Sequence, residues 1–173
     1  MVTTRSGRVM TTARSDPSPV AVEAALAGGF TIVVDTREQQ PYAFDGAVIK
    51  GLPSGDYSIL GLEDRVAVER KSKPDAYASL GRGRARFRRE VERLAVLDYA
   101  AIVIEDTVPG FLRRPPHSQM SPRAAISTLL SWSVRYRIPV FFAGDRTHGR
   151  ALTQKLLVMY WRHRREVARV CVQ

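Results

Sequence analysis

The sequence predicts an α/β fold in which a central mixed β-sheet is flanked by helices on both faces. Short apolar, β-branched runs alternate along the chain with longer segments whose apolar residues recur at helical spacing. The composition, with 45% hydrophobic and 25% charged residues, is that of a globular protein. A length of 173 residues corresponds to one domain, and no internal repeat is visible.

The first residues carry no pattern of packed structure. Residues 1–18 are rich in Thr, Ser, Arg and Pro and lack apolar periodicity, so we expect a flexible basic tail. Residues 20–26 predict a short helix that ends at Gly28 and Gly29. The single domain is therefore expected to cover residues 19–173.

Short strands are predicted next. Residues 30–35 predict a buried strand, and residues 47–50 predict a second extended segment. Residues 56–60 and 65–69 predict a β-hairpin whose loop is residues 61–64.

Two helices are predicted after the hairpin. Residues 74–80 predict a short helix, and a longer helix begins at about Ala85. The longer helix has an arginine-rich face and an apolar stripe, which consists of Phe87, Val91, Leu94 and Leu97.

Strands and helices continue to alternate in the second half. Residues 99–104 predict the clearest buried strand of the chain, and residues 106–120 predict a long irregular connection. Ser121 and Pro122 suit the start of a helix, which is expected to run to about Arg137.

The chain then predicts a last strand and a last helix. The strand is expected over residues 138–142, and Asp145 can cap the helix that follows. The residues expected to face inward from this helix are Leu152, Leu156, Leu157, Met159 and Tyr160.

Charge is the first indication of function. The chain has 27 Lys and Arg residues against 17 Asp and Glu, a formal net charge of +10. Nearly all of these cations are arginines, whose planar guanidinium suits bidentate phosphate contacts. Nucleic acid is the simplest partner for such a surface, although acidic lipid or a need for solubility would also explain the charge.

Other features exclude several classes of protein. No apolar run approaches the length of a membrane span, and the N-terminus lacks the apolar core of a secretory signal. A lone cysteine, Cys171, excludes an internal disulfide and fits a cytoplasmic protein.

Polar residues gather at the ends of the predicted hairpin. Because alternate residues of a strand share a face, Glu69 and Lys71 project together while Arg70 points to the opposite side. Asp56, across the hairpin, is expected to lie close to Glu69. Two neighbouring carboxylates repel each other and require a cation between them.

A divalent metal would supply that cation. Magnesium prefers oxygen ligands and retains several waters, so two carboxylates and one backbone carbonyl suffice. Asp35 and Arg37 form a second pair on one face at the end of the first strand. Asp35 could extend the acidic site and Arg37 could hold a phosphate, or the two could form a structural salt bridge.

Three ordered motifs carry a family resemblance. They are Val-Val-Asp35-Thr-Arg37-Glu38, Gly55-Asp56-Tyr57 and Glu69-Arg70-Lys71-Ser-Lys-Pro-Asp75. Together they resemble the GD…ERKxxxD signature of XPF-type structure-specific endonucleases, which belong to the PD-(D/E)XK restriction-endonuclease-like superfamily. The resemblance extends over about residues 30–161.

The resemblance implies a restriction-endonuclease-like fold and Mg²⁺-dependent cleavage of DNA, with Mn²⁺ as a substitute metal. Asp56 and Glu69 would be metal ligands, with the Arg70 carbonyl as a third, and Lys71 would be the catalytic lysine. The remaining residues implied in the site or its support are Asp35, Arg37, Arg70 and Asp75, with Asp35 also a candidate metal ligand; Asp75 could instead hold the turn.

DNA contacts are expected directly after the motif. The arginines proposed to bind the DNA backbone are Arg82, Arg84, Arg86, Arg89 and Arg93. Family nuclease domains pair through their late helices, so a homodimer is expected, with the apolar surface of Trp132, Tyr160 and Trp161 as its interface.

The chain also departs from the family pattern. About 30 residues follow the last predicted strand, too few for the usual helix-hairpin-helix module, so a separate DNA-targeting protein could supply it. Glu90 stands where the family has glutamine. The layout resembles free-standing bacterial and phage members, which would be nucleoid-associated in the cytoplasm. A catalytically silent DNA-binding subunit of a heterodimer remains the alternative.

Overall fold

A computed structural model describes residues 28–170 of the chain. The tail expected over residues 1–18, the helix expected over residues 20–26 and Cys171 lie outside the described residues. None of the helices within residues 28–170 is both long enough and apolar enough to cross a membrane.

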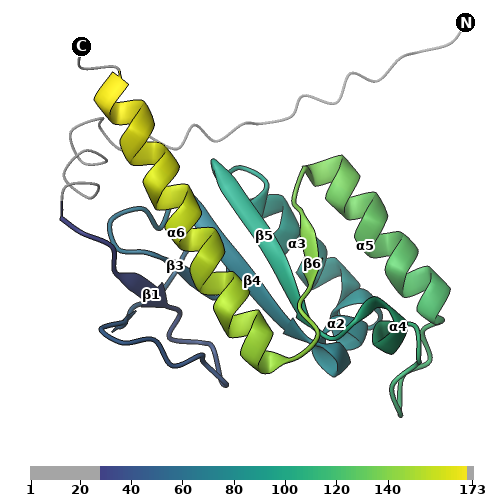
Figure 1. The fold of residues 1–173 in the computed structure, drawn as a ribbon. Helices are drawn as coiled ribbons and strands as arrows, with labels where there is room; N and C mark the ends of the chain where they lie inside the picture. Colours follow the sequence, from purple (N-terminus) through teal and green to yellow (C-terminus); the bar gives the residue numbers. More distant parts are fainter. Residues whose placement is uncertain (1–27, 171–173) are drawn as a thin grey trace, which may run out of the picture.

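The strands form one six-stranded mixed sheet in the order β2-β1-β3-β4-β5-β6 (Figure 1). Their bounds are β1 Ile32–Val34, β2 Val48–Ile49, β3 Tyr57–Ile59, β4 Val66–Ser72, β5 Tyr99–Glu105 and β6 Val140–Phe142. The β1–β3 and β3–β4 pairs are antiparallel, whereas β1–β2, β4–β5 and β5–β6 are parallel. The predicted hairpin and mixed sheet are thus confirmed.

The two central strands share a register that positions the polar residues at one edge of the sheet. β4 pairs with β5 in parallel from Val66 opposite Tyr99 to Ser72 opposite Glu105. β4 begins with buried apolar residues and continues into the charged Glu69–Lys71, and β5 is buried and apolar from Ala100 to Ile104 and ends with Glu105. Their carboxyl ends therefore leave the apolar core together, which brings Arg70 to Glu105 on one face and leaves Glu69 and Lys71 on the other.

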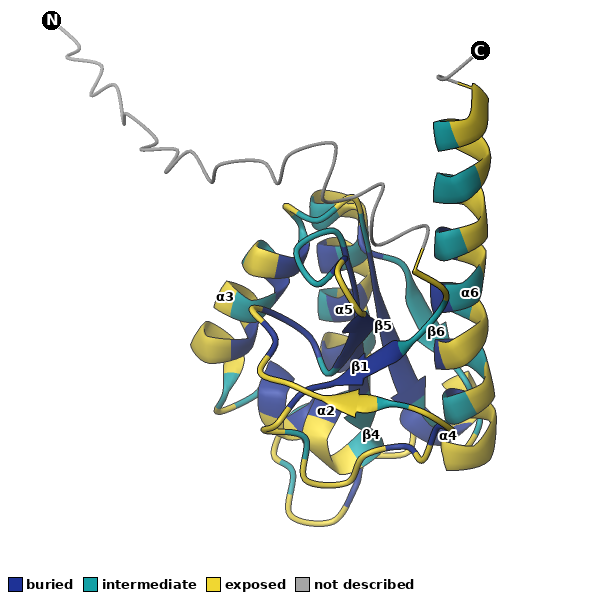
Figure 2. Cartoon of the chain, turned by 90° about the vertical axis from the view of Figure 1, so that its left-hand side faces the viewer, coloured by how far each residue is buried: buried dark blue, intermediate teal, exposed yellow. Residues whose placement is uncertain are grey.

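Helices cover both faces of the sheet, as predicted. α2 (Lys73–Leu80), α3 (Arg84–Leu94) and α5 (Pro122–Tyr136) pack on one face with Ala67 and Ile102. α6 (Arg146–Val170) packs on the other with Val66, Val68 and Val103. In Figure 2, β4 and β5 are dark blue along much of their length because both faces are covered.

Two expectations about the late segments are wrong. The connection expected to be irregular over residues 106–120 contains a short helix, α4 (Val108–Phe111). The Thr107 hydroxyl accepts a hydrogen bond from the Gly110 amide and so caps α4, whose first turn contains a proline. In α6, Met159 is exposed and Thr153 is buried instead, because the inward stripe follows Thr153, Leu157 and Tyr160.

The predicted aromatic interface is also not formed as one surface. Trp132 is buried beside Phe87, with ring centroids 5.7 Å apart, on the face covered by α3 and α5. Tyr160 and Trp161 pack on the opposite face of the sheet, where Trp161 contacts Phe30. The sheet separates them because α5 and α6 lie on different sides.

Candidate active site

A tight turn places Asp56 at the start of β3. Gly55 has a φ of +74°, and a Cβ added there would lie 2.9 Å from the Ala67 Cβ, so the position requires glycine. The Asp56 amide then donates to the Val68 carbonyl at 3.0 Å, and its carbonyl accepts from the Asp35 amide at 2.9 Å. The Gly-Asp motif therefore fixes the aspartate between β1 and β4.

Glu69 and Lys71 extend from β4 on the same side, as strand alternation predicts. The Lys71 Nζ lies 2.7 Å from the Glu69 Oε1 and 5.0 Å from the centre of the Phe87 ring. The Glu69 side chain is 6% exposed and that of Lys71 is 17% exposed. The ion pair is thus held in a largely dry environment against α3.

Asp56, Glu69 and Lys71 line one pocket of about 260 Å³. Burial, and then the negative charge of Glu69, raises the pKa of Asp56 to about 8. Burial also raises the pKa of Glu69, although Lys71 opposes this. Burial disfavours the Lys71 ammonium, but Glu69 and Asp56 keep its pKa above the usual value. The pocket therefore opposes ionisation of both carboxyl groups, and an added cation would favour it.

The donor set of this pocket fits a hard divalent cation. The Asp56 Oδ2 accepts the Arg70 amide at 2.7 Å and the Glu69 Oε1 binds Lys71, so these contacts engage one oxygen of each carboxylate. Within residues 28–170 no cluster of three acidic, His or Cys side chains has a metal-site arrangement. The two carboxylates would therefore suit a divalent cation whose other ligands are a backbone carbonyl and water.

Asp35 lies at the same pocket, but its oxygens are already engaged. Its Oδ1 accepts from the Arg37 amide and Nε, and its Oδ2 accepts from the Arg37 Nη2 and the Leu52 amide, at 2.7 to 2.8 Å. These hydrogen bonds hold the pKa of Asp35 below its usual value although burial opposes this. Of the two roles expected for this pair, the geometry is that of a structural salt bridge between Asp35 and Arg37. It keeps the Arg37 guanidinium at the mouth of the pocket.

Asp75 does not line the pocket. Its carboxylate lies 2.5 Å from the Ser72 Oγ, and that hydroxyl accepts the Asp75 amide at 3.3 Å. This is the arrangement of a helix N-cap, and it starts α2 directly after β4. The charge of Asp75 still contributes to the raised pKa of Lys71.

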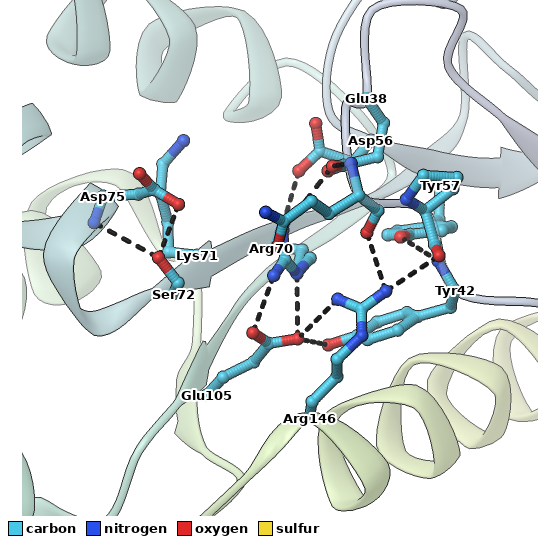
Figure 3. Close-up of polar contacts among 12 residues, drawn as sticks. Glu38, Tyr42, Asp56, Tyr57, Arg70, Lys71, Ser72, Asp75, Glu105 and Arg146 are labelled. Atoms are coloured by element: carbon cyan, nitrogen blue, oxygen red, sulfur yellow. Dashed lines mark hydrogen bonds and ion pairs between the residues drawn. The ribbon is translucent and has the colours of Figure 1, made fainter.

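Arg70 points to the opposite face of β4, into a network not predicted from the sequence (Figure 3). Its guanidinium forms two hydrogen bonds with Glu105, at 2.7 and 2.8 Å, and lies 3.5 Å from Glu38. Glu105 also accepts from the Tyr42 hydroxyl at 2.8 Å and from Arg146 at 3.4 Å. One signal in the sequence indicates that Glu105 belongs to this network, which is that it ends the most apolar strand.

Arg146 extends this network to a distant part of the chain. It lies in the first turn of α6 and donates to the carbonyls of Gln40 at 2.9 Å and Pro41 at 2.8 Å. The loop after β1, the end of β5 and the start of α6 are therefore joined beneath Asp56.

Glu90, which stands where the family has glutamine, has a structural role that the sequence did not predict. Its Oε1 accepts from the Ser54 hydroxyl at 2.7 Å and from the Gly55 amide at 3.0 Å, and its Oε2 binds Arg93. Although burial opposes it, these contacts hold the pKa of Glu90 below its usual value. A carboxylate at this position thus anchors the turn that carries Asp56.

The predicted DNA-binding arginines lie around the turn between α2 and α3 and along α3. Arg86 and Arg93 line the pocket, and Arg82 lines a neighbouring cavity. Arg84 packs over the Trp132 ring at 5.2 Å and donates to Thr128 at 3.1 Å, whereas Arg89 is exposed. Most of the cluster therefore borders the two cavities.

Comparison with known proteins identifies the family. The ERCC4 domain model matches residues 34–156. The fold is similar to XPF from Aeropyrum pernix, with a TM-score of 0.62 and 22% identity over 80% of this chain and 69% of that chain. For the XPF from Aeropyrum pernix in complex with DNA, the TM-score is 0.61, with 22% identity over 76% of this chain and 65% of that chain.

No protein with a curated description matches the chain. The solved structures nevertheless show the restriction-endonuclease-like fold expected from the motifs, and the matched residues contain all three of them except the first valine. The XPF-type resemblance is thereby confirmed, and the chain belongs to the ERCC4 domain family.

Proposed function

We propose that the protein is a Mg²⁺-dependent DNA endonuclease that hydrolyses phosphodiester bonds at branched, flap or fork DNA in repair or recombination. The observation that carries this proposal is the convergence of Asp56, Glu69 and Lys71 in one pocket bordered by Arg86 and Arg93. Membership of the ERCC4 domain family supports it.

Each residue has a distinct part in the proposed reaction. Asp56 and Glu69 would hold Mg²⁺ together with the Arg70 carbonyl, and the bound ion would polarise the phosphate and acidify a water molecule. The Lys71 ammonium remains protonated and stabilises negative charge that develops on the phosphoryl oxygens. Arg37 at the pocket mouth orients the backbone as water adds to phosphorus and one ester bond breaks.

A substrate panel tests the proposal. Single-stranded, duplex, flap and fork DNA are incubated with the protein in Mg²⁺, in Mn²⁺ and without metal, beside the Lys71→Ala variant. We expect cleavage only with metal, strongest on flap or fork DNA, and none by the variant. Equal cleavage without metal would reject the proposed chemistry.

The second candidate, a silent DNA-binding subunit, predicts a different response to metal. A silent subunit would show neither a heat of binding nor a change in stability when Mg²⁺ or Ca²⁺ is added. The presence of both carboxylates and the lysine in one pocket favours the enzyme.

Phosphate binding by the arginine cluster leads to a prediction about salt. The proposed phosphate ligands are Arg82, Arg84, Arg86, Arg89 and Arg93. Arg86→Gln and Arg89→Gln should each weaken duplex binding regardless of sequence and reduce the salt slope by about 0.9 for each phosphate that is no longer neutralised. Binding is measured by fluorescence anisotropy between 50 and 300 mM KCl, roughly the range in which such interactions are screened. The exposed Arg135 on α5 provides the control Arg135→Gln, and an equal effect there would contradict the assignment.

A homodimer is proposed through the β6 edge and α5, in place of the aromatic surface expected from the sequence. β6 is the last strand of the sheet and its three residues are half-buried. On α5, Leu130 is 58% exposed and Val134 is 82% exposed. We expect a dimer by sedimentation at micromolar concentration and a monomer for Val134→Glu; a monomeric wild type would reject the interface. A separate DNA-targeting protein remains part of the proposal.

A further inference from the structure

A second cavity, of about 430 Å³, lies beside the candidate active site. One wall is α2, which contributes Pro74, Tyr77 and Ala78. The other wall is the loop before α5, with Pro115, Pro116 and Met120. Its volume is within the range of sites that bind small organic groups.

Contacts behind and within its walls hold this cavity in shape. The Tyr77 ring packs on Phe111 at 4.9 Å, and its hydroxyl donates to the Phe111 carbonyl at 2.6 Å. In the loop, Pro115 is buried and its carbonyl accepts from the Ser118 amide at 3.4 Å. The cavity is therefore formed before any ligand arrives, which reduces the entropic cost of binding.

The lining chemistry suits a flat apolar group attached to an anion. Most lining residues are apolar, and none is a carboxylate. Arg82 is exposed at the cavity and provides the cationic part, and the exposed His117 adds a polar group. This contrasts with the active-site pocket, where three carboxylates besides Asp35 face the interior.

The two cavities lie on either side of one short segment. Ser79 and Arg86 line the active-site pocket, whereas Ala78 and Arg82 line the second cavity. The segment from Gly81 to Gly83 connects α2 to α3 between them. A DNA strand that crosses this segment would present one phosphate to the active site and a nearby nucleotide to the second cavity.

We propose that this cavity binds an unpaired nucleotide of the strand that is cut, with the base against the apolar walls and its phosphate on Arg82. A base within a duplex is paired and stacked and cannot enter, so the ligand must be single-stranded. The inference rests on the proposed nuclease function and adds to it the part of the protein that would hold the unpaired strand beside the cut.

Ala78→Trp tests the inference by filling the cavity. Ala78 is exposed on α2, so a larger side chain there leaves the core intact. The matched control is Ala151→Trp, at an exposed position of α6 on the opposite face of the sheet. Binding of oligodeoxythymidine and of a duplex of equal length is measured by anisotropy without metal, and thermal unfolding verifies that each variant is folded.

We expect Ala78→Trp to weaken oligodeoxythymidine binding about tenfold, the loss of one stacked base, and to change duplex binding less than twofold. Ala151→Trp should change neither. Arg82→Gln should weaken single-strand binding and reduce its salt slope by about 0.7, while Arg162→Gln on α6 should not. For Ala78→Trp, an unchanged affinity, or an equal loss for both DNAs, would overturn the inference.

This experiment separates the two proposals because it measures binding alone. If Ala78→Trp behaves like the wild type while metal-dependent cleavage is observed, the nucleotide site is wrong and the nuclease stands. If the variant selectively loses single-strand binding while no cleavage is observed, the nuclease proposal fails and the nucleotide site stands.

Discussion

Asp56→Asn will abolish metal-dependent cleavage and will stabilise the metal-free protein at high pH. The variant removes one of the two carboxylates proposed to hold Mg²⁺, and the loss of activity should exceed the roughly 10- to 100-fold that loss of a residue supporting a ligand typically costs. The asparagine side-chain oxygen can still accept the Arg70 amide hydrogen bond, so the fold is retained.

The effect on stability follows from the sign of the pKa shift. Burial and the neighbouring Glu69 and Glu38 charges raise the pKa of Asp56 to about 8 despite Lys71 and the Arg70 amide. Between the unfolded pKa of about 3.9 and the folded value, the folded state binds more protons than the unfolded state. The stability of the wild type therefore falls as the pH rises through this window, and the asparagine variant avoids this part of the loss.

Thermal unfolding at pH 5 and pH 9 measures the difference. The variant's advantage in melting temperature over the wild type should be small at pH 5 and larger at pH 9 without metal. Added Mg²⁺ should stabilise the wild type alone. Asp45→Asn, at an exposed position, is the control. A difference that does not depend on pH would show that the Asp56 charge is not buried as described.

Glu105→Gln should weaken both the fold and the metal site, although Glu105 lies behind the pocket. The Arg70 side chain is 6% exposed and would lose its bidentate partner. Breaking a buried ion pair typically costs about 3–5 kcal/mol. Because the Arg70 amide holds Asp56 and its carbonyl is a proposed ligand, metal affinity should also fall, by about 10- to 100-fold.

Chemical denaturation and calorimetry with Mg²⁺ test these two effects. Tyr42→Phe removes a single hydrogen bond to Glu105 and should show a smaller loss in the same direction. Glu92→Gln breaks an exposed ion pair with Arg88 and should change little. If Glu105→Gln destabilises the protein but leaves metal affinity unchanged, Glu105 supports only the fold.

Local periodicity predicted much of this architecture. The two-residue alternation along β4 was enough to place Glu69 and Lys71 together and Arg70 apart, because a strand that continues into its charged end keeps its pleat. The same alternation, with the hairpin, predicted that Asp56 would join them.

Contacts between distant residues could not be predicted in this way. The carboxylate of Asp35 accepts a hydrogen bond from the Leu52 amide, which belongs to a loop distant in the sequence. The separation of Trp132 from Tyr160 depends on which face each helix takes, and residue spacing alone does not specify a face. The α4 helix was missed because four residues are too few to show a period, although Thr107 and Pro109 were available as start signals.

The hydrogen bonds from Arg146 to the loop after β1 affect the order in which the protein can fold during its synthesis. The partners of Arg146 are Gln40, Pro41 and Glu105, which are synthesised well before it. In a nascent chain that ends before α6, one apolar face of the central sheet would be uncovered. Glu105 would also lack its hydrogen bond from Arg146. The network around Arg70 and Glu105 is therefore complete only after α6 has been synthesised.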